Sequence, residues 1–323
     1  MKPHLRLASL IFNQPQLVTD PMMSLAAQWA NQAMNLNIVN LTVYGSLPKI
    51  MEDDGPDQGV QMATAWERRR AIVAESGMDT IPVSGILVSR SAHMNACEPM
   101  TSYEGLRTAV NQAVTDPAVE HIVLDIDSNG GSATGAFELA DDIHAAARIK
   151  PITAIVNFSA FSGGYLIAAA ASEVIVSRTS GVGSIGVIAN HLDVSKRDEQ
   201  QGVKVTSVFA GDHKNNLTPH EPLSDRSLQF LTEMVQNNYA QFVDAIANYR
   251  GRTTAAIRDT QAGVFFGQQG VDAGLADRIE TPQAAVNRIA TEIRAARADQ
   301  HAHAVPRKSV SARAAAMNMR AAL

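Results

Sequence analysis

Residues 152–171 place a serine between a buried strand and a helix. Ile152 to Val156 is an apolar, β-branched run typical of a buried strand, and the alanine-rich end of the stretch favours a helix. Ser162-Gly163-Gly164 falls between the two, and a helix N-terminus there would present free N–H groups and partial positive charge. Ser162 therefore either caps the helix or exposes a hydroxyl beside groups that stabilise negative charge.

The same alternation of short strands and longer helices extends on both sides of this serine. It predicts an α/β fold with a mostly parallel sheet and flanking helices. The expected strands are 81–88, 121–126, 152–156, 173–177 and 204–209, and the expected helices are 102–114, 135–148 and 224–250.

Composition excludes several classes of protein. The 323 residues are 46% hydrophobic with a formal charge of −5, which gives no reason to expect nucleic-acid binding. The single cysteine, Cys97, excludes an internal disulfide and a cysteine-rich metal site, and it has no basic neighbour to make it a nucleophile. We expect no cofactor and no metal. No apolar run reaches the ~18 residues of a membrane span, so we expect a protein without one.

The chain divides by composition into three regions. Residues 1–76 form an N-terminal accessory region, with predicted helices at 21–35 and 61–75 and an acidic linker at 49–60. Residues 77–282 form the main domain. Residues 283–323 are an alanine-rich tail with seven basic and two acidic residues, which is either a solvated, partly helical terminus or an arm that binds a partner.

Three further glycine-containing turns follow predicted strands. They are residues 124–131, ending in Gly130-Gly131; residues 181–187, with Ser184 between glycines; and residues 209–215, which include Lys214. Backbone N–H groups at such turns can bind an oxyanion, but each turn taken alone is more typical of an ordinary loop.

The order and spacing of these motifs resemble one family. Asp127-Ser-Asn-Gly-Gly131, Ser162-Gly-Gly-Tyr165, Val182-Gly-Ser-Ile-Gly186 and Gly211-Asp-His-Lys214 resemble motifs of the protease IV (signal peptide peptidase A) serine proteases, which have the Clp protease/crotonase-like fold. Gly270 to Asp277 resembles the family's closing element. Residues 12–15, 82–90 and 211–214 are most similar to the phage head-maturation, lambda-type capsid protease branch. Asn129 and Val182 depart from the family's usual Pro and Thr.

The resemblance implies a role for each motif. Ser162 would be the nucleophile, Lys214 a neutral general base, and Ser184 the group that orients its amine. The N–H groups of Gly131 and Gly163 would form the oxyanion hole, which Gly130 would shape. A competing mechanism keeps Ser162 but takes His191 as the base, oriented by Asp193 or Asp212.

The implied function is a serine endopeptidase with a Ser-Lys dyad. Its expected substrate is a polypeptide, a scaffold or portal protein in phage or prophage capsid maturation, and its expected state is a homo-oligomer in the host cytoplasm, associated with the procapsid. The alternatives are a cellular peptidase that degrades signal peptides, a non-proteolytic capsid assembly factor, and a crotonase-like acyl-CoA enzyme.

Overall fold

The computed structural model describes residues 14–19, 23, 58–90 and 100–304. The predicted helix at 21–35 lies outside these residues, apart from Met23, and so do residues 49–57 of the predicted linker, Cys97 and residues 305–323. The predicted helix at 61–75 is confirmed as α3 (Gln58–Ser76), which also takes in the last three residues of the predicted linker.

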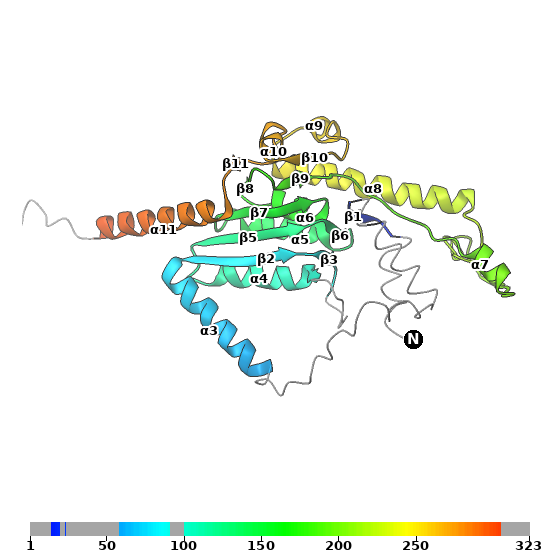
Figure 1. The fold of residues 1–323 in the computed structure, drawn as a ribbon, viewed down its shortest axis with the longest axis horizontal. Helices are drawn as coiled ribbons and strands as arrows, with labels where there is room; N and C mark the ends of the chain where they lie inside the picture. Colours follow the sequence, from blue (N-terminus) through cyan, green and yellow to red (C-terminus); the bar gives the residue numbers. More distant parts are fainter. Residues whose placement is uncertain (1–13, 20–22, 24–57, 91–99, 305–323) are drawn as a thin grey trace, which may run out of the picture.

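A seven-stranded sheet forms the centre of the molecule (Figure 1). β2 (Met78–Ser84), β5 (His121–Ser128), β7 (Ile152–Phe161), β8 (Glu173–Val176) and β11 (Arg278–Ile279) pair in parallel, and β9 (Gly181–Gly183) also pairs in parallel with the far end of β7. Only β10 (Val264–Phe266) runs antiparallel, against β9. The predicted α/β class with a mostly parallel sheet is confirmed.

A smaller sheet lies at the carboxyl end of β5. Its order is β1 (Gln16–Val18), β6 (Gly130–Ser132), β3 (Ile86–Val88) and β4 (Met100–Ser102). The single strand predicted at 81–88 is therefore two strands in two sheets. Gly85 separates them with a φ of 69°, a conformation that glycine adopts without steric cost.

Four helices cover one face of the central sheet: α4 (Tyr103–Thr115), α5 (Ala136–Ala146), α6 (Gly163–Ala169) and α8 (Asp225–Tyr249). α4 and α8 each begin at a serine cap, because the side chains of Ser102 and Ser224 accept hydrogen bonds from the backbone N–H three residues on. α6 is buried along its whole length between the sheet, α5 and α8. The remaining helices, α7 (Ser195–Gln200), α9 (Thr254–Arg258) and α10 (Gln268–Asp272), are short.

The opposite face of the sheet is covered by α11 (Pro282–Ala304). Ala285, Ile289 and Ile293 are buried there in a cluster with Val123, Ile155 and Ile175 of the strands. Arg288 adds ion pairs to Glu173, Glu280 and Glu292. Residues 283–304, predicted as part of a basic tail, thus form a helix that packs on the sheet.

The strand predicted at 204–209 is wrong. Residues 203–209 pair with no strand among the described residues, and their side chains are exposed, with Val208 at 96%. A strand needs a hydrogen-bonded neighbour, which the apolar pattern of a segment cannot supply. Together with α7, this part of the chain extends away from the sheet (Figure 1); residues 201–214 are called the arm below.

Candidate active site

Ser162 stands between the end of β7 and the first residue of α6. Its backbone has φ 52° and ψ −118°, a region that non-glycine residues rarely adopt. It occupies the N-cap position, yet its side chain makes no capping hydrogen bond. The hydroxyl instead points to the carbonyl oxygen of Gly186 at 3.5 Å, a contact at the limit of hydrogen-bond length.

Backbone hydrogen bonds on both sides of Ser162 maintain its strained conformation. Its N–H donates to the carbonyl oxygen of Gly183 across 2.8 Å, and Leu166 N–H donates to the Ser162 carbonyl across 2.9 Å. The side chain of Tyr165, three residues on, donates to the Leu275 carbonyl at 2.9 Å and ties α6 to residues 270–277. Ser162 itself is fully buried.

The predicted oxyanion glycines lie against Ser162. A Cβ built on Gly130, where φ is 97°, would lie 2.9 Å from the backbone nitrogen of Gly163. A Cβ on Gly163 would lie 3.5 Å from the Cα of Gly130. Only glycine at position 130 therefore lets these two backbone segments approach so closely. Gly131, the next residue of β6, belongs to the same buried turn.

Ser128 organises this turn, a role that the sequence reasoning missed. Its hydroxyl donates to the Gly85 carbonyl at 2.7 Å and accepts from the Gly130 N–H at 3.1 Å. A Cβ on Gly164 would lie 2.7 Å from the Ser128 carbonyl oxygen, so α6 and β5 meet backbone to backbone. A serine two residues before a glycine pair is a signal that the sequence offered.

Ser184 follows the hydrogen-bonded Gly183 and shares the positive φ of Ser162, at 54°. Its N–H donates to the Gly263 carbonyl at 2.7 Å, which fixes the loop against β10. The structure therefore brings Ser162, Ser184, Gly130, Gly131 and Gly163 into one region.

Lys214 lies elsewhere within the chain. It is exposed at the end of the arm, where its N–H donates to the Gly211 carbonyl at 3.0 Å. Across the described ranges, no hydrogen bond or ion pair joins its amine to Ser162 or Ser184. Arg226 of α8 donates to the Asp212 carbonyl at 3.2 Å and attaches this turn to the helix.

His191, the competing base, lies in the chain between β9 and α7. Burial lowers its pKa from the ordinary value, and the charge of Asp193 acts against that shift. The Ser195 side chain, and then the Ser195 N–H, which donates a 2.8 Å hydrogen bond to Asp193, lower the pKa of the Asp193 carboxyl. Between the described residues His191 and Ser162 the structure shows no hydrogen bond.

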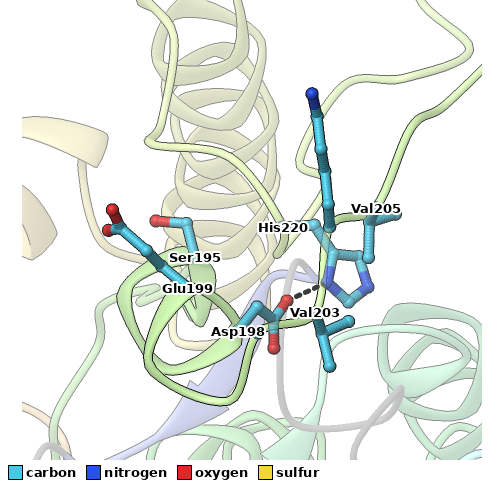
Figure 2. Close-up of a pocket in the computed structure, with 8 residues that line it drawn as sticks. Ser195, Asp198, Glu199, Val203, Val205 and His220 are labelled. Atoms are coloured by element: carbon cyan, nitrogen blue, oxygen red, sulfur yellow. Dashed lines mark hydrogen bonds and ion pairs between the residues drawn. The ribbon is translucent and has the colours of Figure 1, made fainter.

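A surface pocket opens beside the arm, at α7 (Figure 2). Asp198 and His220 point toward each other there, with 2.6 Å between the carboxylate Oδ2 and the ring Nδ1, and Val203 and Val205 lie nearby. None of the predicted catalytic residues lines this pocket.

The described residues also lack two features that would indicate other functions. No helix among them is long and apolar enough to cross a bilayer. Nor do they contain a cluster of three His, Cys, Asp or Glu side chains arranged to hold a metal ion.

The sequence is similar to those of known proteins. Residues 144–296, which include Ser162, Ser184 and Lys214, match peptidase family S49. The chain is 34% identical to the capsid assembly protease C of Escherichia phage lambda over 86% of its own length, and 35% identical to the head-tail preconnector protein GP5 of Enterobacteria phage P21 over 72%. It is 27% identical to a putative signal peptide peptidase SppA of Enterococcus faecium, over 66% of this chain and 62% of that protein.

The chain thus carries a peptidase family S49 domain, and the resemblance found in the sequence is confirmed. It spans 63% of the lambda protein and 46% of the P21 protein. Solved structures similar to it include ClpP1 of Listeria monocytogenes, with a TM-score of 0.42 and 11% identity over 68% of this chain and 99% of that one. An enoyl-CoA hydratase/isomerase family member gives a TM-score of 0.40 and 13% identity over 69% and 74%.

Proposed function

We propose that this chain is a serine endopeptidase whose nucleophile is Ser162. The observation that carries the proposal is the strained backbone of Ser162 at a helix N-terminus that its side chain does not cap. Strain of about 1–3 kcal/mol persists only where surrounding structure imposes it, and such residues cluster at active sites. The hydroxyl is thereby left for chemistry.

The chemistry is acyl transfer followed by hydrolysis. The Ser162 oxygen attacks the carbonyl carbon of a peptide bond while a base takes its proton. The N–H groups of Gly131 and Gly163 stabilise the resulting oxyanion. Return of the proton to the departing amine breaks the peptide bond, and water then hydrolyses the acyl-serine to release the new carboxyl end and free Ser162.

Lys214 is the proposed base, and Ser184 orients its amine. A lysine amine must lose several units from its usual pKa of about 10.4 to act as a base at neutral pH, and burial is the means. Lys214 is exposed in the single chain, so we place it in the site of a neighbouring copy. The exposed Val203, Val208 and Phe209 of the arm support this, because docking on a second copy would bury them. The proposed assembly is a ring-like homo-oligomer.

The proposed substrates are capsid scaffold or portal proteins, cleaved in the host cytoplasm during phage or prophage head maturation. The names and similarity of the lambda and P21 relatives support this choice over degradation of signal peptides. Our proposed division of the chain is 1–76, 77–282 and 283–323, with Ala285, Ile289 and Ile293 at the start of the last region packed on the sheet of the second.

The test is co-expression with candidate scaffold and portal proteins, followed by mass spectrometry of all fragments. Wild type is expected to produce defined fragments that Ser162→Ala does not. Ser159→Ala is the matched control, because Ser159 lies on the same strand but bonds to Asp127; it is expected to match wild type. Identical fragments from wild type and Ser162→Ala would refute the proposal.

A mixing experiment tests the origin of the base. Ser162→Ala and Lys214→Ala proteins are each expected to be inactive, and unfolding and refolding them together should restore part of the activity if Lys214 acts across subunits. An active Lys214→Ala protein together with an inactive His191→Ala protein would instead assign the base to His191.

A further inference from the structure

Strand β1 lies between two parts of the candidate site, β6 on one side and the loop that contains Ile188 on the other. On one side it pairs antiparallel with β6, with Gln16 opposite Ser132, Leu17 opposite Gly131 and Val18 opposite Gly130. On the other side Gln16 exchanges two hydrogen bonds with Ile188, of 2.8 and 3.1 Å. The segment therefore lies between β6, which contains Gly130 and Gly131, and the loop that follows Ser184.

The direction of the Leu17 carbonyl follows from these bonds. Successive peptide groups of a strand point to opposite sides, and both backbone groups of Gln16 point to Ile188. Those of Leu17 therefore point to β6, where its partner is Gly131. A Cβ built on Gly130 would overlap the Leu17 carbonyl oxygen, and one on Gly163 would lie 3.3 Å from it. The Leu17 carbonyl thus lies beside the glycines assigned to the oxyanion hole.

The Leu17 side chain completes the match to a bound peptide. It is fully buried, and a Cβ on Gly163 would lie 3.4 Å from its Cβ, next to the nucleophile. Ser162 is also fully buried while this strand is in place. An added strand is a common way for a protein to bind an extended peptide, with backbone hydrogen bonds for affinity and a side-chain pocket for selectivity.

We propose that Gln16–Val18 is a built-in occupant of the peptide-binding groove, held where a substrate would lie, and that it competes with other peptides for Ser162. This rests on the proposed function for the identity of the groove. Leu17 occupies the position of the residue whose carbonyl would be attacked. A peptide with an aliphatic residue there is the expected ligand once the strand has left.

A disulfide that locks the strand in place tests the proposal. Gln16 and Ser132 are a non-hydrogen-bonded antiparallel pair, whose Cα atoms lie about 4.5 Å apart, within the range that a disulfide spans. Gln16→Cys and Ser132→Cys are combined in a Cys97→Ser background. Oxidation is expected to lower the rate of peptide hydrolysis at least about tenfold, because the disulfide depopulates the state in which the strand has left the groove. Reduction is expected to restore the rate.

The comparison is made within one protein, oxidised against reduced, with the Gln16→Cys single variant as the control that should not respond to oxidant. A cross-linked protein, verified by its mass, that hydrolyses peptide at the reduced rate would overturn the proposal. So would a cysteine pair that stays reduced under oxidant, since Gln16 would then not face Ser132.

A binding measurement separates this inference from the proposed function. Leu17→Asp in the full chain should expel the strand, because a carboxylate would otherwise be buried. A fluorescent peptide of residues 14–19 is expected to bind this variant in an anisotropy titration, and to bind wild type and Thr19→Asp about tenfold more weakly. If the peptide binds but no variant hydrolyses peptides, the proposed protease function is rejected and the inference that β1 occupies the groove is retained. Equal affinity for all three proteins would reject the inference.

Discussion

The backbone N–H of Ser162 donates a 2.8 Å hydrogen bond to the carbonyl oxygen of Gly183. That bond joins two motifs that are separated in the chain by α6 and β8, and it places Ser184 directly after a residue that is bonded to Ser162. The site therefore depends on how closely backbone segments approach one another, and glycine substitutions test it.

Gly164→Ala is expected to abolish activity with a smaller effect on folding. The new Cβ would lie 2.7 Å from the Ser128 carbonyl oxygen and would push α6, and Ser162 with it, away from β5. Peptide hydrolysis and the urea midpoint of unfolding are measured together. Gly251→Ala is the control for activity, because a Cβ there meets nothing within 4 Å and its φ of 59° limits the effect of alanine to a local backbone cost away from the site. Full activity in Gly164→Ala would mean that this contact does not position the serine.

Ile289→Ala is expected to destabilise the protein by about 2–5 kcal/mol, the usual cost of emptying a buried aliphatic site. Ile289 is fully buried between α11 and the sheet. Urea unfolding gives the measurement, and Asn287→Ala on the exposed face of the same helix should change the free energy of unfolding by less than about 0.5 kcal/mol. Equal stability of the two variants would mean that α11 does not hold the sheet.

His121 predicts a pH dependence of stability. Burial lowers the pKa of its imidazole. The charges of Glu292 and Glu173 act against this shift, and the charge of Arg288 adds to it. The ring Nε2 lies 2.9 Å from the Thr153 hydroxyl. As the pH falls from about 7.5 to 5.5, the unfolded chain binds a proton at His121 that the folded chain resists, so the free energy of unfolding falls.

Wild type should therefore lose more stability over this interval than His121→Gln, which keeps a hydrogen-bonding group beside Thr153. Urea unfolding at several pH values measures both. If the free energy of unfolding changes equally with pH in the two proteins, His121 does not cause the pH dependence.

The sequence predicted the parts of the fold that local patterns control. β5, β7 and β8 are apolar, β-branched runs, and Ser102 and Ser224 mark helix starts, so these elements were found within a few residues. The glycine turns and Ser162 were also found, because their residue types have few other uses in that order.

Long-range pairing accounts for what the sequence did not predict. Residues 204–209 have the composition of a strand, but no other strand in the described part of the chain bonds to them. β1 was not predicted from the sequence, yet its three residues form a strand because β6 and Ile188 provide hydrogen-bonding partners on both sides. The burial of Ile289 likewise depends on the sheet face that it meets.

Hydrolysis of one fluorescent peptide series by purified wild type, Ser162→Ala, Lys214→Ala and Lys204→Ala tests the central claim most directly. Lys204 lies on the same exposed arm as Lys214 and controls for a change of charge there. We expect Ser162→Ala and Lys214→Ala each to lose at least about 100-fold in kcat/KM, the usual contribution of general-base catalysis, and Lys204→Ala to match wild type. A Lys214→Ala protein as active as wild type would contradict the account.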